Sequence, residues 1–273
     1  MLDTSMAITT NSISTYVFDL DGVVYLGDQV IPGATDSINE LMSRKKSVYF
    51  LTNNSSVTRL DYVNKLGRMG IDVDKSQIYT SAFATAMHLK TTAVEHANVF
   101  VIGESGVQQE IKDVGLNVFS EPGSINPSDV DYVVIGIDRS FSYAKLSFGH
   151  ECIVRGRAEF IATNRDTTYP SEIGTVPGAG SLVISLASST AREPLNMGKP
   201  APTALLEIIK AAGSNLDSTL MVGDRLDTDI ACGNLAGTHS ALVLTGVTPI
   251  DEARKAEGHL KPGLIIGSLT KLL

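Results

Sequence analysis

Two acidic side chains two residues apart carry the strongest chemical signal in this 273-residue sequence. Asp19 and Asp21 end an apolar run that begins at Thr15, and Gly22 follows them. Because side chains at i and i+2 of a strand point the same way, both carboxylates can reach one ligand. Such a pair could hold a hard divalent cation while one oxygen attacks an electrophile and the other acid moves a proton. The simpler alternative is a turn in which both aspartates cap the following segment.

A hydroxyl and two amides lie at the end of a second run, 47–52. Thr52 is its last residue, and Asn53 and Asn54 follow it. Their donors and acceptors can hold phosphate oxygens. The alternative is an ordinary polar loop that caps the next helix. Lys199 is a solvated surface lysine unless the fold brings it to the same strand ends. In that position its ammonium could neutralise a carboxylate and a phosphate together.

A second group of acids follows the apolar run 219–223. Asp224, Asp227 and Asp229 lie at a predicted junction between a strand and a helix. Acids are favourable at a helix N-terminus, so dipole complementation explains part of this group. Asp224 holds the same strand-end position as Asp19, and we therefore expect it to be an additional metal ligand.

The elements that must position these residues alternate between short apolar runs and helical patterns. Apolar residues recur at helical spacing near 35–45 and 59–69. This alternation predicts a parallel sheet covered by helices, in which ligands bind at the carboxyl ends of the strands. A middle group of predicted strands near 98–102, 131–137 and 159–163 is flanked by Pro and Gly clusters. Spacing alone leaves open whether that group is a separate domain.

Composition excludes several classes of protein. Lys and Arg number 22 against 30 Asp and Glu, and the net charge of -8 disfavours sequence-independent nucleic-acid binding. Cys152 and Cys232 are far apart in the sequence, which fits a reducing compartment rather than a disulfide scaffold or a zinc ribbon. The apolar runs fall far short of the roughly 18 residues of a spanning helix. The polar segment 1–14 lacks a signal-peptide pattern. We therefore expect a cytoplasmic protein with no nucleic-acid or membrane partner.

In this order, the four polar stretches resemble the four motifs of the haloacid dehalogenase superfamily, and in particular its NagD-like branch of phosphatases. They are Asp19-Leu-Asp-Gly22, Thr52-Asn-Asn54, Gly198-Lys-Pro200 and Gly223-Asp-Arg-Leu-Asp-Thr-Asp229. The resemblance runs from about residue 15 to the C-terminus. It implies an α/β fold with a Rossmann-like core, a parallel sheet and an inserted α/β cap of type IIA. The implied core is discontinuous, with residues 1–89 and 194–273, and the implied cap spans residues 90–193.

The resemblance also implies a Mg²⁺-dependent phosphatase that hydrolyses a small phosphomonoester through an aspartyl-phosphate. Asp19 would be the nucleophile, and Asp21 would protonate the leaving oxygen and then deprotonate the attacking water. An acid at the position of Asp21 favours phosphate chemistry over dehalogenation, because a halide leaving group needs no proton. Asp19, the backbone carbonyl of Asp21, and Asp224 would hold the metal. Asp229 would steady Lys199 or a metal-bound water.

Two sets of residues are implied to bind substrate, one in the motifs and one in a cap loop that sets specificity. They are Thr52, Asn53, Asn54 and Lys199 in the motifs, and Asn164, Arg165, Asp166 and Tyr169 in the loop. Read without the resemblance, the loop is a connection in which Asp166 caps a turn. para-Nitrophenyl phosphate is the generic substrate, and phosphoglycolate, a nucleotide or a sugar phosphate are physiological candidates. Homodimers through the cap are usual in this branch, so we expect a homodimer. The alternative function is a non-catalytic protein that binds a phosphometabolite or regulates a partner on the same fold.

Overall fold

The computed structural model describes residues 12–171 and 174–273, which form two compact units. The first unit holds the residues up to Thr52 together with Val63–Tyr79 and Lys199–Leu273. The second holds Asn53–Tyr62 and Thr80–Gly198. Most of the polar segment 1–14 lies outside the described residues. Within the described ranges, none of the helices combines the length and the apolarity that a membrane span requires.

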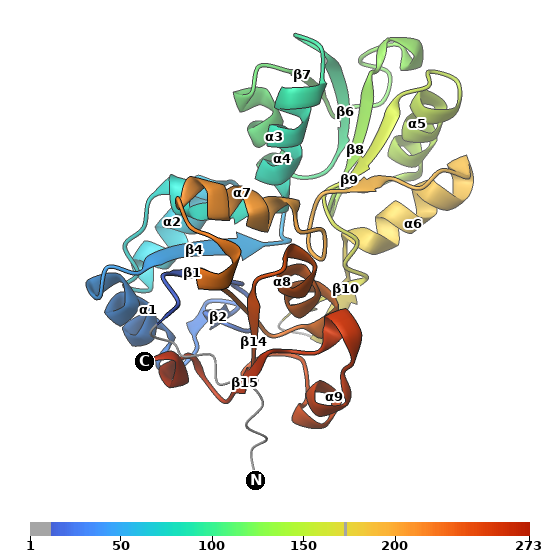
Figure 1. The fold of residues 1–273 in the computed structure, drawn as a ribbon. Helices are drawn as coiled ribbons and strands as arrows, with labels where there is room; N and C mark the ends of the chain where they lie inside the picture. Colours follow the sequence, from blue (N-terminus) through green and yellow to red (C-terminus); the bar gives the residue numbers. More distant parts are fainter. Residues whose placement is uncertain (1–11, 172–173) are drawn as a thin grey trace. The chain divides into compact units, whose positions relative to one another are not determined.

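A six-stranded sheet with the order β15-β14-β13-β1-β4-β5 organises the first unit (Figure 1). Its strands are β1 (Thr15–Phe18), β4 (Ser47–Thr52), β5 (Ile78–Thr80), β13 (Thr219–Gly223), β14 (His239–Val243) and β15 (Leu264–Ile266). β1 pairs in parallel with both β4 and β13, and Phe18 lies opposite Phe50 and Val222. All four β1 residues are buried, as expected for a central strand covered on both faces. The carboxyl ends of β1, β4 and β13 therefore meet at one edge of the sheet.

Helices of ordinary amphipathic pattern accompany this sheet. They are α1 (Ala34–Ser43), α2 (Arg59–Arg68), α7 (Thr203–Ala211), α8 (Ala231–Ala236) and α9 (Ile250–Lys255). In α1, buried Ile38 and Leu41 repeat at helical spacing. The helices predicted near 35–45 and 59–69 are confirmed as α1 and α2. A hairpin of β2 (Tyr25–Leu26) and β3 (Gln29–Val30) follows β1, and a π-helical turn, Leu226–Ile230, follows β13.

The second unit has its own sheet, with the order β12-β9-β8-β6-β7 and parallel pairing throughout. Its strands are β6 (Asn98–Ile102), β7 (Asn117–Phe119), β8 (Tyr132–Ile135), β9 (Glu159–Ala162) and β12 (Leu195–Asn196). The three strands predicted in the middle of the chain are confirmed as β6, β8 and β9. An antiparallel hairpin joins β10 (Thr168–Ser171) to β11 (Gly174–Pro177).

Four helices cover the two faces of this second sheet: α3 (Ser81–Thr92), α4 (Ser105–Asp113), α5 (Tyr143–Val154) and α6 (Ala179–Thr190). Alternate residues of β6 enter different cores. Val99 and Val101 pack with residues of α3 and α4, whereas Phe100 and Ile102 pack with residues of α5 and α6. Figure 1 shows the two helix pairs on opposite sides of β6, β8 and β9. This unit contains all of residues 90–193, together with flanking segments.

Candidate active site

Asp19 lies directly after β1, at the edge where the three strand ends meet. Its backbone N–H donates to the carbonyl of Val222 at 2.8 Å, which extends the pairing with β13 by one residue. The Asp19 side chain is buried, and its Oδ1 lies 2.6 Å from Nζ of Lys199. The strand therefore delivers a carboxylate to a site where water is scarce and a cation is close.

Lys199 is buried, so the solvated-surface alternative for this residue is excluded. Its ammonium donates to Asp19 Oδ1 at 2.6 Å, to Asp229 Oδ1 at 2.6 Å and to the Leu51 carbonyl at 3.0 Å. Burial alone would lower the pKa of Lys199, but the charges of Asp19 and Asp229 outweigh burial and raise it. The lysine is therefore a permanent cation that joins the ends of β1, β4 and the π-helical turn.

The acids after β13 separate into an inner and an outer set. Asp224 and Asp229 are buried, and with Asp19 they offer three carboxylate oxygens that all lie within 4.8 Å of one another. Asp229 Oδ2 also accepts the N–H of Arg225 at 3.1 Å, which fixes its orientation. Asp227 is exposed and forms an ion pair with Arg225 at 2.8 Å. Asp227 therefore lies apart from the cluster of Asp19, Asp224 and Asp229, named here the acid cluster.

The acid cluster carries more negative charge than its lysine can balance. When all three carboxylates are ionised, they and the one ammonium carry a net charge of minus two, which is the charge that a divalent cation neutralises. Burial raises the pKa of Asp19; the charge of Lys199 opposes this shift, and those of Asp229 and Asp224 reinforce it. Burial, reinforced by the charge of Asp229, raises the pKa of Asp224 to about 7. The site is therefore electrostatically incomplete without a further positive charge.

The residues present fit a hard cation, as one orphaned atom shows. Oδ1 of Asp224 is buried and has no hydrogen-bond partner among the described residues. Leaving such an oxygen unpaired costs free energy, and carboxylate oxygens are the ligands that Mg²⁺ prefers. The other oxygen, Oδ2, accepts the N–H of Val247 at 2.8 Å.

Asp21 sits on a tight turn that reverses the chain after β1. The Leu20 carbonyl accepts the N–H of Val24 at 2.9 Å, and Gly22 has a φ of 82°, a left-handed conformation that favours glycine. The N–H of Gly22 donates to the Tyr25 carbonyl at 2.8 Å. Burial raises the pKa of Asp21, against opposing charges on Lys65 and Lys199. A raised pKa suits a group that must hold a proton near neutral pH.

The remaining motif residues continue from the end of β4. Thr52, the last residue of β4 and of the first segment of the first unit, is buried. Asn53 begins the second unit, where its Nδ2 donates to Asp166 at 3.0 and 3.2 Å and its carbonyl accepts Nδ2 of Asn164 at 2.7 Å. Asn54 Oδ1 accepts the N–H of the residue two positions on at 2.9 Å, the geometry of a capped turn. Three of the predicted substrate residues, Asn53, Asn164 and Asp166, thus form one hydrogen-bonded group.

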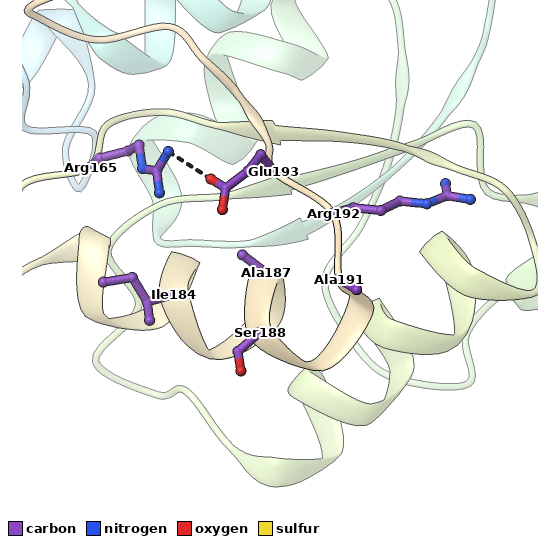
Figure 2. A pocket seen from close by; sticks show the side chains of 7 residues that line it. All are labelled: Arg165, Ile184, Ala187, Ser188, Ala191, Arg192 and Glu193. Carbon is purple, nitrogen blue, oxygen red and sulfur yellow. Dashed lines mark ion pairs between the residues drawn. The ribbon is translucent and has the colours of Figure 1, made fainter.

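The other two predicted loop residues have different neighbours in the second unit. Arg165 pairs with Glu193 at 2.8 Å, and both line a surface hollow of about 370 Å³ beside α6 (Figure 2). The phenol oxygen of Tyr169 accepts Nε of Arg139 at 3.3 Å. Asp19, Asp224 and Asp229 are not among the residues that line the hollow.

One segment of the first unit that contacts the site escaped the sequence analysis. It is the turn after β14, where Thr245, Gly246 and Val247 approach Gly22 and Asp224. The sequence does hold a signal for this turn. An apolar run ends at Leu244 and small and polar residues follow it, just as polar residues follow the apolar runs that end before Asp19 and Asp224.

Two family models match the chain. One, described as haloacid dehalogenase-like hydrolase, matches residues 16–117, and the other, described as HAD-hydrolase-like, matches residues 196–272. The 5′-nucleotidase YutF of Bacillus subtilis is 38% identical, over 94% of this chain and 96% of its own length. A solved 4-nitrophenylphosphatase from Thermotoga maritima superposes with a TM-score of 0.88 and 34% identity, over 98% of each chain. The chain therefore belongs to the haloacid dehalogenase-like hydrolases.

Within that family the chain is a phosphatase of the NagD-like branch. NagD from E. coli K-12 superposes with a TM-score of 0.83 and 30% identity, over 96% of this chain and 99% of its own. The predicted family and the predicted α/β fold with a parallel-sheet core are confirmed.

Proposed function

We propose that the chain hydrolyses small phosphomonoesters with the help of Mg²⁺ and through an aspartyl-phosphate on Asp19. The observation that carries this proposal is Nζ of Lys199 held 2.6 Å from both Asp19 and Asp229, beside the orphaned oxygen of Asp224. This arrangement combines a buried nucleophile, a fixed cation and a set of hard oxygen ligands. Phosphoryl transfer depends mainly on positioning and on charge neutralisation, and these groups supply both.

In the first step, a carboxylate oxygen of Asp19 attacks phosphorus while the bond from phosphorus to the ester oxygen breaks. Asp21 gives its proton to that leaving oxygen. In the second step, Asp21 takes a proton from water as the water oxygen attacks phosphorus, and the bond to Asp19 breaks. The products are an alcohol and inorganic phosphate, and both acids return to their starting states.

Lys199 holds Asp19 in place and balances the charge of the phosphoryl group throughout both steps. Asp229 keeps the ammonium in position through its 2.6 Å contact. Asp19, Asp224 and the backbone carbonyl of Asp21 would hold Mg²⁺, which when bound supplies positive charge to the phosphoryl oxygens.

The resemblance to NagD-like phosphatases supports a substrate class and an assembly state. Thr52 and the hydrogen-bonded group of Asn53, Asn164 and Asp166 are proposed to contact substrate, as are Asn54, Arg165 and Tyr169. Phosphoglycolate, nucleotides and sugar phosphates are the proposed physiological range. Relatives of the chain include proteins named 5′-nucleotidase and phosphoglycolate phosphatase, which supports that range. We further propose a cytoplasmic homodimer that assembles through the second unit.

Hydrolysis of para-nitrophenyl phosphate, with and without Mg²⁺, tests this function. We expect Asp19→Asn to abolish turnover and to leave the thermal unfolding temperature close to that of the wild type. Asp227→Asn is the matched control, because this exposed acid of the same motif lies outside the acid cluster. Undiminished hydrolysis by Asp19→Asn would refute the mechanism. A wild-type chain inert toward every phosphomonoester tried would favour the alternative of a non-catalytic binding protein.

A further inference from the structure

The turn after β14 makes two hydrogen bonds to the residues around the acid cluster. The hydroxyl of Thr245 donates to the Gly22 carbonyl at 2.7 Å, and the N–H of Val247 donates to Asp224 Oδ2 at 2.8 Å. One bond fixes the backbone just after Asp21, and the other fixes the carboxylate of Asp224. The turn thus joins two strand ends that the sequence places about 200 residues apart.

Glycines make the close approach of this turn possible. A Cβ built on Gly246 would overlap Oδ2, Cγ and Cβ of Asp224. A Cβ built on Gly22 would lie 2.5 Å from Asp224 Oδ2 and 3.2 Å from the Cα of Gly246. Gly246 has no positive φ, so its requirement for glycine is steric. Any side chain at position 246 must push the Asp224 carboxylate out of place.

The two carboxylate oxygens of Asp224 therefore differ in their hydrogen bonding. Oδ2 is held by Val247, while Oδ1 is buried with no partner in the described part of the chain. We propose that Thr245, Gly246 and Val247 form a positioning turn that presents Asp224 Oδ1 alone to a divalent cation. This inference rests on the proposed function, since it concerns the metal that the function requires.

The turn acts before any cation arrives. Because Asp224 and the Gly22 backbone are already held, binding need not order them, and affinity gains from this pre-organisation. Groups that hold a metal ligand from behind typically change metal affinity by about 10- to 100-fold when they are lost. We expect the positioning turn to contribute within that range.

Calorimetric titration of the full-length protein, stripped with EDTA, with Mg²⁺ alone tests the inference without measuring activity. We expect Gly246→Ala to bind Mg²⁺ about 10- to 100-fold more weakly than the wild type. Gly267→Ala is the matched control, because a Cβ there meets nothing within 4 Å and Gly267 has no positive φ. The control should bind like the wild type.

A second pair of variants guards against misfolding of Gly246→Ala, which circular dichroism would reveal. Thr245→Val keeps the shape but loses the donor to Gly22, whereas Thr245→Ser keeps the donor. We expect Thr245→Val to weaken Mg²⁺ binding and Thr245→Ser to restore most of it. A merely structural role would lower the unfolding temperature of Thr245→Val and leave the affinity of the folded protein unchanged.

The outcomes separate this inference from the proposed function. If the wild type binds Mg²⁺ and the folded variants bind it equally well, the positioning turn is refuted and the proposed function stands. If the wild type itself binds no Mg²⁺, the metal dependence of the proposed function fails, and the inference fails with it.

Discussion

Replacing Lys199 with methionine tests the electrostatic account of the site. The substitution removes the ammonium that contacts Asp19 and Asp229 at 2.6 Å and keeps an unbranched apolar side chain of similar length. Asp19 and Asp229, whose ligand atoms lie within 4.8 Å of each other and of Asp224, then lose the ammonium that contacted both. Breaking a buried ion pair by removing one partner typically costs about 3–5 kcal/mol. We expect a loss of unfolding free energy in that range for Lys199→Met at neutral pH without metal.

The size of this loss should depend on pH in a defined direction. Burial already raises the pKa of Asp19, and removing the opposing charge of Lys199 raises it further. A carboxyl group with a raised pKa in the folded state contributes stability at low pH, and this contribution is lost as pH rises through that pKa. The loss of unfolding free energy caused by Lys199→Met should therefore become smaller as the pH falls from about 8 to about 5. Lys199 stays charged over that range, because its own pKa is raised.

Urea denaturation in EDTA, followed by circular dichroism, measures the loss. Lys210→Met is the matched control, because Lys210 is exposed on α7 and its replacement should change stability by less than about 0.5 kcal/mol. Adding Asp229→Asn to Lys199→Met should cost less than the sum of the single changes, by about 1 kcal/mol or more. A deficit for Lys199→Met as small as that of the control, or one that grows as pH falls, would refute the reasoning.

Three further predictions concern the chemistry and the second unit. Asp21→Asn should slow hydrolysis of alkyl phosphates by about 10²- to 10⁴-fold and that of para-nitrophenyl phosphate much less, because nitrophenolate leaves without a proton; equal losses would contradict the acid role. EDTA should abolish hydrolysis by the wild type and Mg²⁺ should restore it, as colorimetric assay would show; full activity in EDTA would exclude a required metal. Arg59→Met should lower the free energy of unfolding by about 3 kcal/mol in urea denaturation, because it leaves the buried Glu110 carboxylate, which Arg59 contacts at 2.9 and 3.0 Å, without this partner. Arg155→Met is the control, because Arg155 pairs with Glu151 at the surface, and its loss should stay within about 0.5 kcal/mol.

The longer strands, the first two helices and the acids at the strand ends were predictable because their signals are local, whereas short strands such as β5, β7 and β12 were not predicted. Apolar runs and helical spacing mark the elements, and parallel pairing brings their carboxyl ends together whatever the details of packing. The burial of Lys199 was not predictable from its neighbours in the sequence. It depends on contacts with residues 180 and 148 positions away, Asp19 and Leu51.

Composition and spacing alone did not separate the inner from the outer acids after β13; only the family resemblance gave Asp229 a role and Asp227 none. Both acids lie in the π-helical turn Leu226–Ile230, where Asp229 is buried and Asp227 is exposed. Asn53 and Asp166 were predicted as independent substrate contacts, yet they hydrogen-bond each other across 113 residues. Contacts of this length depend on how the second unit folds, and a single sequence holds no direct record of them.

The order of strands in the first sheet has a consequence for how the chain is made. β1 lies between β4 and β13, and its residue Thr15 pairs with Thr219, some 204 positions later. At about 5–20 residues per second, a ribosome needs about 10–40 s to make that stretch. The segments of the second unit, Asn53–Tyr62 and Thr80–Gly198, are complete before β13 is made, whereas until then one edge of β1 has no strand to pair with. The acid cluster is therefore among the last parts of the chain to form, because it is complete only after Asp229 has left the ribosome.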